Sequence, residues 1–259
     1  MSQRAFSLVE LSIVLVILGL LTGGILAGQS LIHASELRSL TTQFTNYTSA
    51  VQNFQTKYGA VPGDFSDGTK YWGRENSNAD CITNYSAAVS SMGVCDGNAD
   101  GGIGLGGAGN QASESFQFWR ELAVAGMIDG KFTGIAGATS SYTSVADSNV
   151  PSTKIAGGAW FVQLFGGPVS GNTVLFDGDY ANIFEVGAVT SNDPAGLLFK
   201  PEDMQNLDSK LDDGMPGTGK FRARSWSTCT TATASSQLGA TYLVSSTTPL
   251  CVIIFANQF

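Results

Sequence analysis

The first apolar positions along the chain form one uninterrupted block. From Phe6 to Gly28 the sequence reads FSLVELSIVLVILGLLTGGILAG, with Glu10 as its charged residue. A helix of that length spans about 34 Å, enough to cross a hydrocarbon core of ~30 Å. The block is longer than the apolar region of a secretory signal peptide and continues into an amphipathic pattern. The sequence therefore predicts a membrane-spanning helix that is retained.

Beyond this block the apolar positions recur in alternating steps of three and four residues, which is the spacing of one helix face. Such a seam is typical of a coiled coil, and it suits packing on the protein's own domain equally well. His33 lies four residues before the seam, which favours a semi-buried helix residue over a metal ligand. Gly59 and Pro62 end the helix after Tyr58. The seam residues are Leu37, Leu40, Phe44, Tyr47, Val51, Phe54 and Tyr58.

After Gly59 the pattern changes to short apolar runs separated by Gly, Ser, Thr, Asn and Asp. Helical spacing predicts an amphipathic helix over 113–128, and a second, short helix should begin at Pro201 and run towards Leu211. The predicted fold is α+β, with a long N-terminal helix packed on a mostly antiparallel sheet. The expected strands are Trp160–Phe165, Thr173–Phe176, Ile183–Val189, Phe221–Trp226, Tyr242–Val244 and Leu250–Phe255.

Composition narrows the class of protein. The chain has 259 residues, of which 43% are hydrophobic and 13% charged, and its net charge is -8. One domain with a stalk fits this length, and so charge-poor a chain is typical of an exported protein. The negative field disfavours nucleic acid as a partner. With one histidine, His33, near the N-terminus, His-dependent catalysis in the bulk of the chain is excluded, so we expect no enzyme and no catalytic residues.

Glu10 needs an explanation, because an ionised carboxylate inside a bilayer costs about 2.5–3.5 kcal/mol on insertion scales. One interpretation places it near the membrane surface, where it stays wet or protonated. The other is an ion pair across an interface between helices, in which two opposite charges offset part of each other's desolvation.

The segment Ala5-Phe6-Ser7-Leu8-Val9-Glu10-Leu11, behind a short leader carrying Arg4, resembles the processing signature of type IV pilins and type II secretion pseudopilins. The resemblance implies cleavage by prepilin peptidase between Ala5 and Phe6, and N-methylation of Phe6. It further implies that Glu10 pairs with the N-terminus of a neighbouring subunit in a filament. Ala5 departs from the Gly that this family prefers before the cut, although Ala is also small.

The same resemblance divides the chain into a leader (1–5), a long helix (6–58, with 6–28 in the membrane or filament core) and a head (59–259). Val61-Pro62-Gly63-Asp64 and Tyr71-Trp72-Gly73 are also similar to segments of large pilin-like proteins. The implied function is a minor structural subunit of a type IV pilus or type II secretion-like filament. Its implied partners are other pilin subunits, the peptidase and the inner-membrane assembly machinery.

The implied localisation is the inner membrane with a periplasmic head, followed by a filament in the periplasm or on the cell surface. Two other classes stay open. A pilus-associated adhesin would bind a ligand through the head, and loss of adhesion without loss of assembly would favour it. A membrane-anchored hydrolase using acidic residues is the weaker alternative, and turnover by the purified head would favour that one.

Four cysteines in an exported chain predict disulfides, and the sequence allows three pairings. We favour Cys81 with Cys95 and Cys229 with Cys251, because each pair closes one modest loop.

An acidic loop suggests calcium. Asp96, Asn98 and Asp100 with Gly101 match the start of a calcium-binding loop, whose oxygen ligands alternate and whose glycine permits the sharp bend. Position twelve is Gly107 instead of a bidentate Glu, so Glu114, Glu121 or a distant Asp would have to substitute. The alternative is a plain Asx-Gly turn.

A second acidic group contains Asp208, Asp212 and Asp213, and it either binds a cation or ends a helix. No other cofactor is expected, since two glycine-rich motifs, 102–107 and 214–220, lack the context of nucleotide sites.

Overall fold

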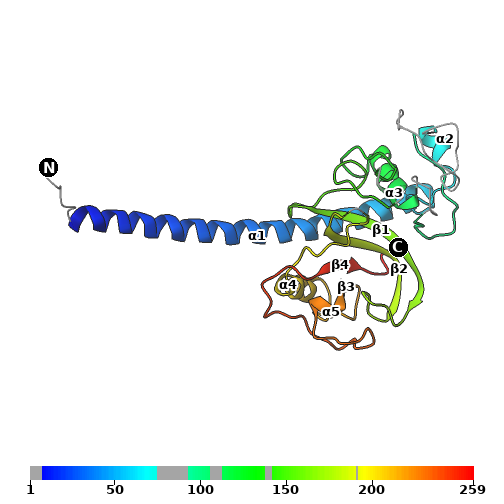
Figure 1. Cartoon of the computed structure of the whole chain (residues 1–259). Helices are drawn as coiled ribbons and strands as arrows, with labels where there is room; N and C mark the ends of the chain where they lie inside the picture. Colours follow the sequence, from blue (N-terminus) through cyan, green and yellow to red (C-terminus); the bar gives the residue numbers. More distant parts are fainter. Residues whose placement is uncertain (1–7, 75–92, 106–112, 138–141, 191) are drawn as a thin grey trace.

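The computed structural model describes residues 8–74, 93–105, 113–137, 142–190 and 192–259. One long helix, α1 (Leu8–Tyr58), extends from a head that combines a sheet with short helices. Figure 1 shows the N-terminal half of α1 projecting from the head and its C-terminal half running through it. This arrangement confirms the predicted α+β class.

Helix α1 contains 51 residues, which corresponds to about 77 Å. It ends where predicted: Gly59 takes a left-handed φ of 71°, and its N–H donates to the Gln55 carbonyl at 2.8 Å. A residue with a Cβ would be strained in this conformation, so glycine suits the position. The predicted start at Phe6 lies outside the described residues.

The sheet has four strands in the order β1-β2-β4-β3, and all three pairings are antiparallel. Its strands are β1 (Gly158–Val169), β2 (Gly178–Ala188), β3 (Phe221–Arg224) and β4 (Val252–Phe255). The last strand in the sequence therefore lies between β2 and β3. Four of the six predicted strands correspond to these elements, with ends that differ by a few residues.

The other two predicted strands are wrong. Thr173–Phe176 is a loop, because Asn172 Oδ1 accepts hydrogen bonds from the N–H groups of Val174 at 2.8 Å and Leu175 at 2.9 Å. An Asx turn of this kind competes with strand formation. The 242–244 segment contributes only an isolated bridge, from Tyr242 to Thr230. Leu175, Phe176 and Tyr242 are nevertheless buried, so their apolar character reflects packing and not strand structure.

The C-terminal half of α1 packs on one face of the sheet. Phe44 stacks on Phe255 of β4 with ring centroids 3.9 Å apart. Tyr47 meets Trp160 of β1 edge-on at 5.2 Å. The Trp160 indole N–H also donates to Gln43 Oε1 at 3.1 Å. The seam of α1 thus packs within its own chain, with Leu40, Val51 and Phe54 buried and Leu37, Phe44, Tyr47 and Tyr58 partly buried against the same core.

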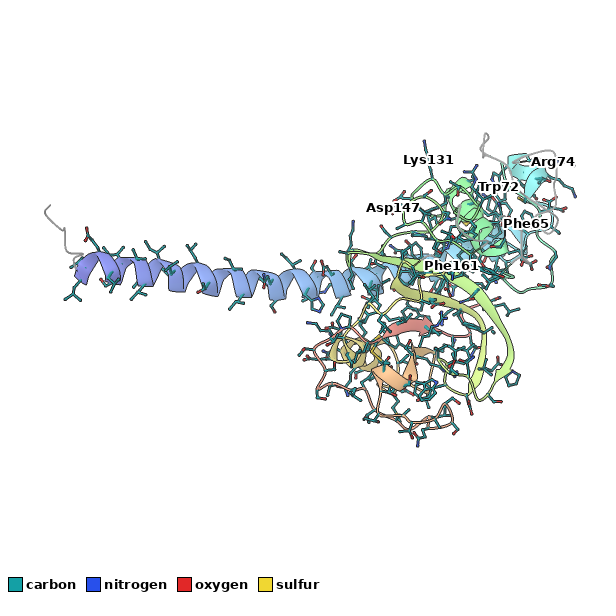
Figure 2. The ribbon with its side chains drawn as sticks, viewed as in Figure 1. Phe65, Trp72, Arg74, Lys131, Asp147 and Phe161 are labelled. Atoms are coloured by element: carbon teal, nitrogen blue, oxygen red, sulfur yellow. A yellow bond between two sulfur atoms is a disulfide. The ribbon has the colours of Figure 1, made fainter. Side chains whose placement is uncertain are left out.

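Helix α3 (Glu114–Val124) packs against the same core and confirms the helix predicted over 113–128. Trp119 of α3 lies edge-on to Tyr47 at 5.0 Å. Helix α4 (Pro201–Leu211) begins at the predicted proline. Two short helices, α2 (Gly68–Trp72) and α5 (Trp226–Cys229), complete the head. Figure 2 shows side chains filling the head on both sides of α1, with Phe65 and Trp72 at the end distant from the projecting helix.

The disulfide between Cys229 and Cys251 is present, as predicted. It joins α5 to the residue before β4. Cys95 is fully buried, while Cys81 lies outside the described residues. The second pairing therefore stays a prediction.

Candidate functional site

The projecting half of α1 presents an apolar surface to its surroundings on every side. The helix is long and apolar enough to cross a membrane, and its apolar stretch is not buried within the molecule. Its large apolar side chains between Leu8 and Leu26 are between 50% and 86% exposed. Soluble proteins rarely expose so large a continuous apolar surface, so this half of the helix needs lipid or other helices around it.

Glu10 lies in the first turn of α1, and it is exposed within this apolar surface. The structure thus places the carboxylate where a neighbouring helix or the membrane surface can reach it. Ala5 and Phe6, the residues of the predicted cleavage, lie outside the described residues. Their processing remains a prediction.

The two halves of α1 meet near His33. Its Nε2 atom lies 2.9 Å from Asp203 Oδ1 of α4, and its Nδ1 atom lies 3.8 Å from Glu36. A groove of about 560 Å³ between α1 and α4 contains this pair. His33 is thus a partly buried helix residue, as predicted, and it contacts the head through α4.

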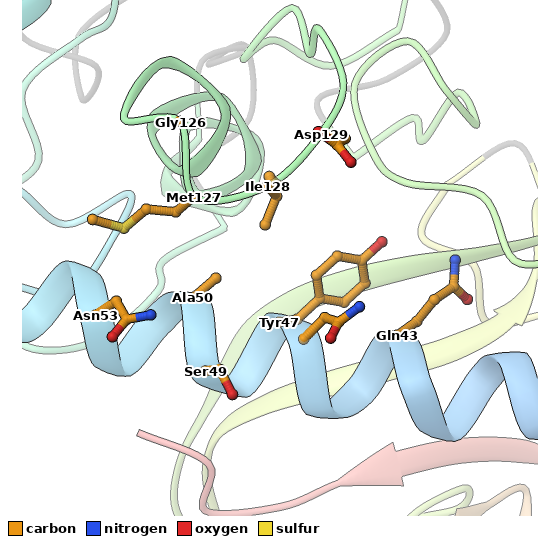
Figure 3. Close-up of a pocket in the computed structure, with 10 residues that line it drawn as sticks. Gln43, Tyr47, Ser49, Ala50, Asn53, Gly126, Met127, Ile128 and Asp129 are labelled. Atoms are coloured by element: carbon orange, nitrogen blue, oxygen red, sulfur yellow. The ribbon is translucent and has the colours of Figure 1, made fainter.

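A second hollow, of about 370 Å³, lies between α1 and the segment after α3. Figure 3 shows Gln43, Tyr47 and Asn53 lining it from the helix, with Met127 and Asp129 opposite. Its lining mixes amide, hydroxyl and carboxylate groups with apolar side chains. Such a surface suits polar contacts, and no cluster of nucleophile and base converges on it among the residues that line it.

The predicted calcium loop folds around its own hydrogen bonds. Asp96 accepts from the Thr69 N–H at 2.8 Å and from the Thr69 hydroxyl at 2.9 Å. Asn98 Nδ2 donates to Asp100 Oδ2 at 2.9 Å, and Asp100 Oδ1 accepts from the Gly102 N–H at 2.8 Å. The side chain of Asp96 is thereby directed to Thr69, and those of Asn98 and Asp100 to each other.

Two glutamates of α3 lie beside this loop, although they follow its predicted ligands by many residues in the sequence. Glu114 accepts from the N–H groups of Asn98 at 3.3 Å and Gly104 at 2.7 Å. Glu121 accepts from the Gly63 N–H at 2.6 Å. Burial raises the pKa of Glu114 to about 7 and raises the pKa of Glu121 well above its usual range. The sequence pattern suggested Glu114 and Glu121 only as replacements for the bidentate Glu that the calcium loop lacks at its twelfth position.

The second acidic group is compact. Asp208, Asp212 and Asp213 each offer an oxygen atom within 4.8 Å of the others, and this geometry could hold a metal ion. These carboxylates also have donors of their own. Asp208 accepts from the Tyr242 hydroxyl at 2.6 Å and Asp213 from the Met215 N–H at 2.9 Å. Asp212 is the C-cap residue of α4, and the Asp213 carboxylate closes the following turn. Ending a helix is one of the two roles that the sequence allowed for this group.

The head also contains a buried charge network that the sequence pattern did not predict. Glu185 of β2 is completely buried, and Arg224 of β3 pairs with it and with Asp193. Gln163 of β1 donates to the same carboxylate at 2.8 Å. Burial outweighs the attraction of Arg224 and raises the pKa of Glu185 to about 7. A charged residue inside a strand of apolar neighbours is the signal that could have revealed it.

Comparison with known families gives a match at the N-terminus of the chain. Residues 1–26 match the family described as the prokaryotic N-terminal methylation motif, which is the prepilin signal of type IV pilins and pseudopilins. The match covers the predicted cleavage site, Glu10 and most of the apolar block. Comparison with curated proteins and with solved structures gives no match for the chain.

Proposed function

We propose that this chain, which carries the prepilin signal of type IV pilins and pseudopilins, is a structural subunit of a type IV pilus or type II secretion-like filament. It would be cleaved before Phe6, methylated there and assembled through α1. The observation that carries the proposal is the apolar half of α1, which projects from the head with its side chains exposed.

The apolar half of α1 could pass from lipid into a filament core at little cost in free energy. In lipid its apolar side chains are solvated by acyl chains, and in a filament core they would be solvated by equivalent helices. Because both environments are apolar, the exchange costs little hydrophobic free energy, and packing with polar contacts decides the outcome. An ion pair formed by Glu10 between helices would offset part of the cost of burying its charge and would favour assembly.

The proposed partners are further pilin or pseudopilin subunits, the prepilin peptidase and the inner-membrane assembly machinery. The chain would sit in the inner membrane with its head in the periplasm, and then enter a filament in the periplasm or on the cell surface. A mature length above that of compact major pseudopilins supports a minor subunit. We propose no catalytic role.

The decisive variant is Glu10→Leu, with Glu202→Leu, at an exposed position of α4, as the matched control. Membrane insertion should persist in both, because neither removes apolar surface. Incorporation into filaments, measured by shearing and immunoblotting in the native host, should fall at least tenfold for Glu10→Leu only. Normal incorporation of this variant would eliminate the ion-pair assembly mechanism.

Processing needs a separate measurement. Mass spectrometry of the protein from its native host should show a chain that begins with N-methylated Phe6. A chain that still begins at Met1 and is never found in a filament would replace the proposal with a simple tethered domain.

A further inference from the structure

The groove between α1 and α4 lies where the apolar surface of α1 ends. Leu31 and Ile32 are the last large apolar side chains exposed along this helix, at 72% and 61%. Ser30 and His33, on either side of them in the sequence, already line the groove. Figure 1 shows α4 at the end of the head nearest to the projecting half of α1. A chain inserted in a membrane through this half therefore holds the groove at the membrane surface.

Helix geometry gives the height of the groove above the lipid tails. Arg38, which lines the groove, follows Ile32 by six residues, which corresponds to about 9 Å along the helix axis. The headgroup layer of a bilayer extends about 5–7 Å beyond the hydrocarbon core on each side. Helical side chains lean towards the N-terminus, which is the membrane side here, and a long basic side chain can carry its charge back towards the surface. The Arg38 guanidinium is thus within reach of the lipid phosphates.

Two cationic side chains on the groove have no anionic partner within the described part of the chain. Arg38 of α1 and Lys210 of α4 both line it and are exposed, and none of the ion pairs found there includes either residue. Asp203 is the acid among the lining residues, and its Oδ1 atom already lies 2.9 Å from His33 Nε2. Positive charge thus predominates in the groove, although the chain as a whole carries a net charge of -8.

The groove also has an apolar base. Leu207 of α4 is 4% exposed and Leu37 of α1 packs partly buried against the same core, and both side chains line the groove. Asn206 and Thr41 add an amide and a hydroxyl group to the lining. The volume of about 560 Å³ is within the range of sites that hold small molecules. Apolar base and cationic rim together suit a ligand that carries an anionic group on a less polar body.

We propose that this groove binds the headgroup of an anionic phospholipid while the chain is in the membrane. Arg38 binds the phosphate through paired N–H donors, and Lys210 adds a second positive charge from α4. Leu37 and Leu207 contact the glycerol backbone. The inference rests on the insertion of α1 into a membrane and is independent of its later assembly into a filament.

The position of the groove favours a lipid over other anions. A free phosphate ion or an acidic side chain of a neighbouring subunit would also satisfy Arg38 and Lys210. A lipid headgroup, however, lies beside the apolar surface of α1 that the acyl chains cover, so it reaches the groove without leaving the bilayer. The bound lipid would bridge α1 and α4 at the junction that His33 and Asp203 also join, and it would hold the head at a defined height above the membrane.

The test uses the full-length protein in micelles of a neutral detergent. Native mass spectrometry measures how many phosphatidylglycerol molecules stay bound to each chain across a titration, and zwitterionic phosphatidylcholine is the comparison lipid. Two variants, Arg38→Gln and Lys210→Gln, each remove one positive charge at an exposed position. Lys200→Gln is the matched control, because it removes the same charge at the start of α4 and outside the groove.

The wild-type chain and Lys200→Gln should bind phosphatidylglycerol more tightly than phosphatidylcholine. Each groove variant should bind phosphatidylglycerol about fivefold more weakly, which is the contribution of one basic residue near an anionic membrane surface. The variant with both substitutions should bind the two lipids equally. Far-ultraviolet circular dichroism checks that each variant is folded. Glu10→Leu should keep the wild-type preference, so a failure of filament assembly and a failure of this inference are distinguishable.

Four results would overturn the proposal. The first is a wild-type chain that binds both lipids equally. The second is an equal loss of binding in Lys200→Gln and in the groove variants, which would show attraction by surface charge alone. The third is displacement of the lipid by an equal concentration of inorganic phosphate, which would indicate a site for a free anion. The fourth is unchanged lipid binding but reduced filament incorporation in the groove variants, which would assign the groove to a neighbouring subunit.

Discussion

The Nε2 atom of His33 lies 2.9 Å from the Oδ1 atom of Asp203, and this contact joins α1 to α4 where the helix leaves the head. Sequence periodicity placed His33 four residues before the seam of α1, as a semi-buried helix residue, without indicating its partner. The contact ties the orientation of the projecting helix to the head. In the proposed filament this orientation would need to be defined, because the helix and the head would contact different neighbours.

His33→Ala should loosen the junction without unfolding the head. The His33 side chain is 44% exposed, so the lost contact should cost less than about 1 kcal/mol of the free energy of unfolding. Amide hydrogen exchange in residues 29–37 should become faster, because α1 loses a contact to α4 there. Ile32→Ala, which changes an exposed neighbour, is the control. Equal exchange in both variants would show that the contact does not restrain the helix.

Leu40→Ala and Leu31→Ala compare the two halves of α1 by the same substitution. Leu40 is 1% exposed in the core, whereas Leu31 is 72% exposed. Loss of the Leu40 side chain should lower the free energy of unfolding by about 2–5 kcal/mol through lost burial and a cavity. Leu31→Ala should change it by roughly 0.5 kcal/mol or less. Urea denaturation of the full-length protein in detergent measures both, and similar losses would contradict the packing described for α1.

Glu185 should make the head less stable as the pH rises. Its pKa is raised to about 7 in the folded protein from a usual value of 4.5, so the folded state holds this proton more tightly than the unfolded state does. The resulting stabilisation is present at low pH and is lost as the pH rises through 7. Between pH 5 and pH 8 the loss should amount to roughly 2 kcal/mol.

Glu185→Gln removes this titrating group, so the stability change between pH 5 and pH 8 should shrink by that amount. Glu202→Gln, at an exposed position of α4, is the control and should keep the wild-type change. Denaturant melts at the two pH values, in the presence of a chelator, measure the difference. An undiminished change in Glu185→Gln would show that other buried acids, such as Asp208, cause the whole effect.

The sequence predicted those helices and strands whose residues themselves carry the pattern, such as apolar periodicity or a capping residue. Helix α1 and its end at Gly59, α3, α4 and four strands follow from periodicity, helix caps and breakers. Thr173–Phe176 shows the limit of such reasoning. Its apolar residues are buried as a strand's would be, but the side chain of Asn172 binds the backbone and turns the chain.

The sequence alone determined that α1 has one apolar half and one seamed half, because composition and spacing along a helix need no other part of the chain. Only the tertiary structure decided what the seam contacts, where β4 enters the sheet and which acids meet. Gly63 and Glu121, for example, are 58 residues apart in the sequence, yet the Gly63 N–H donates a hydrogen bond to Glu121 Oε2 at 2.6 Å. Contacts of this kind depend on the close approach of distant backbones, and no local periodicity records them.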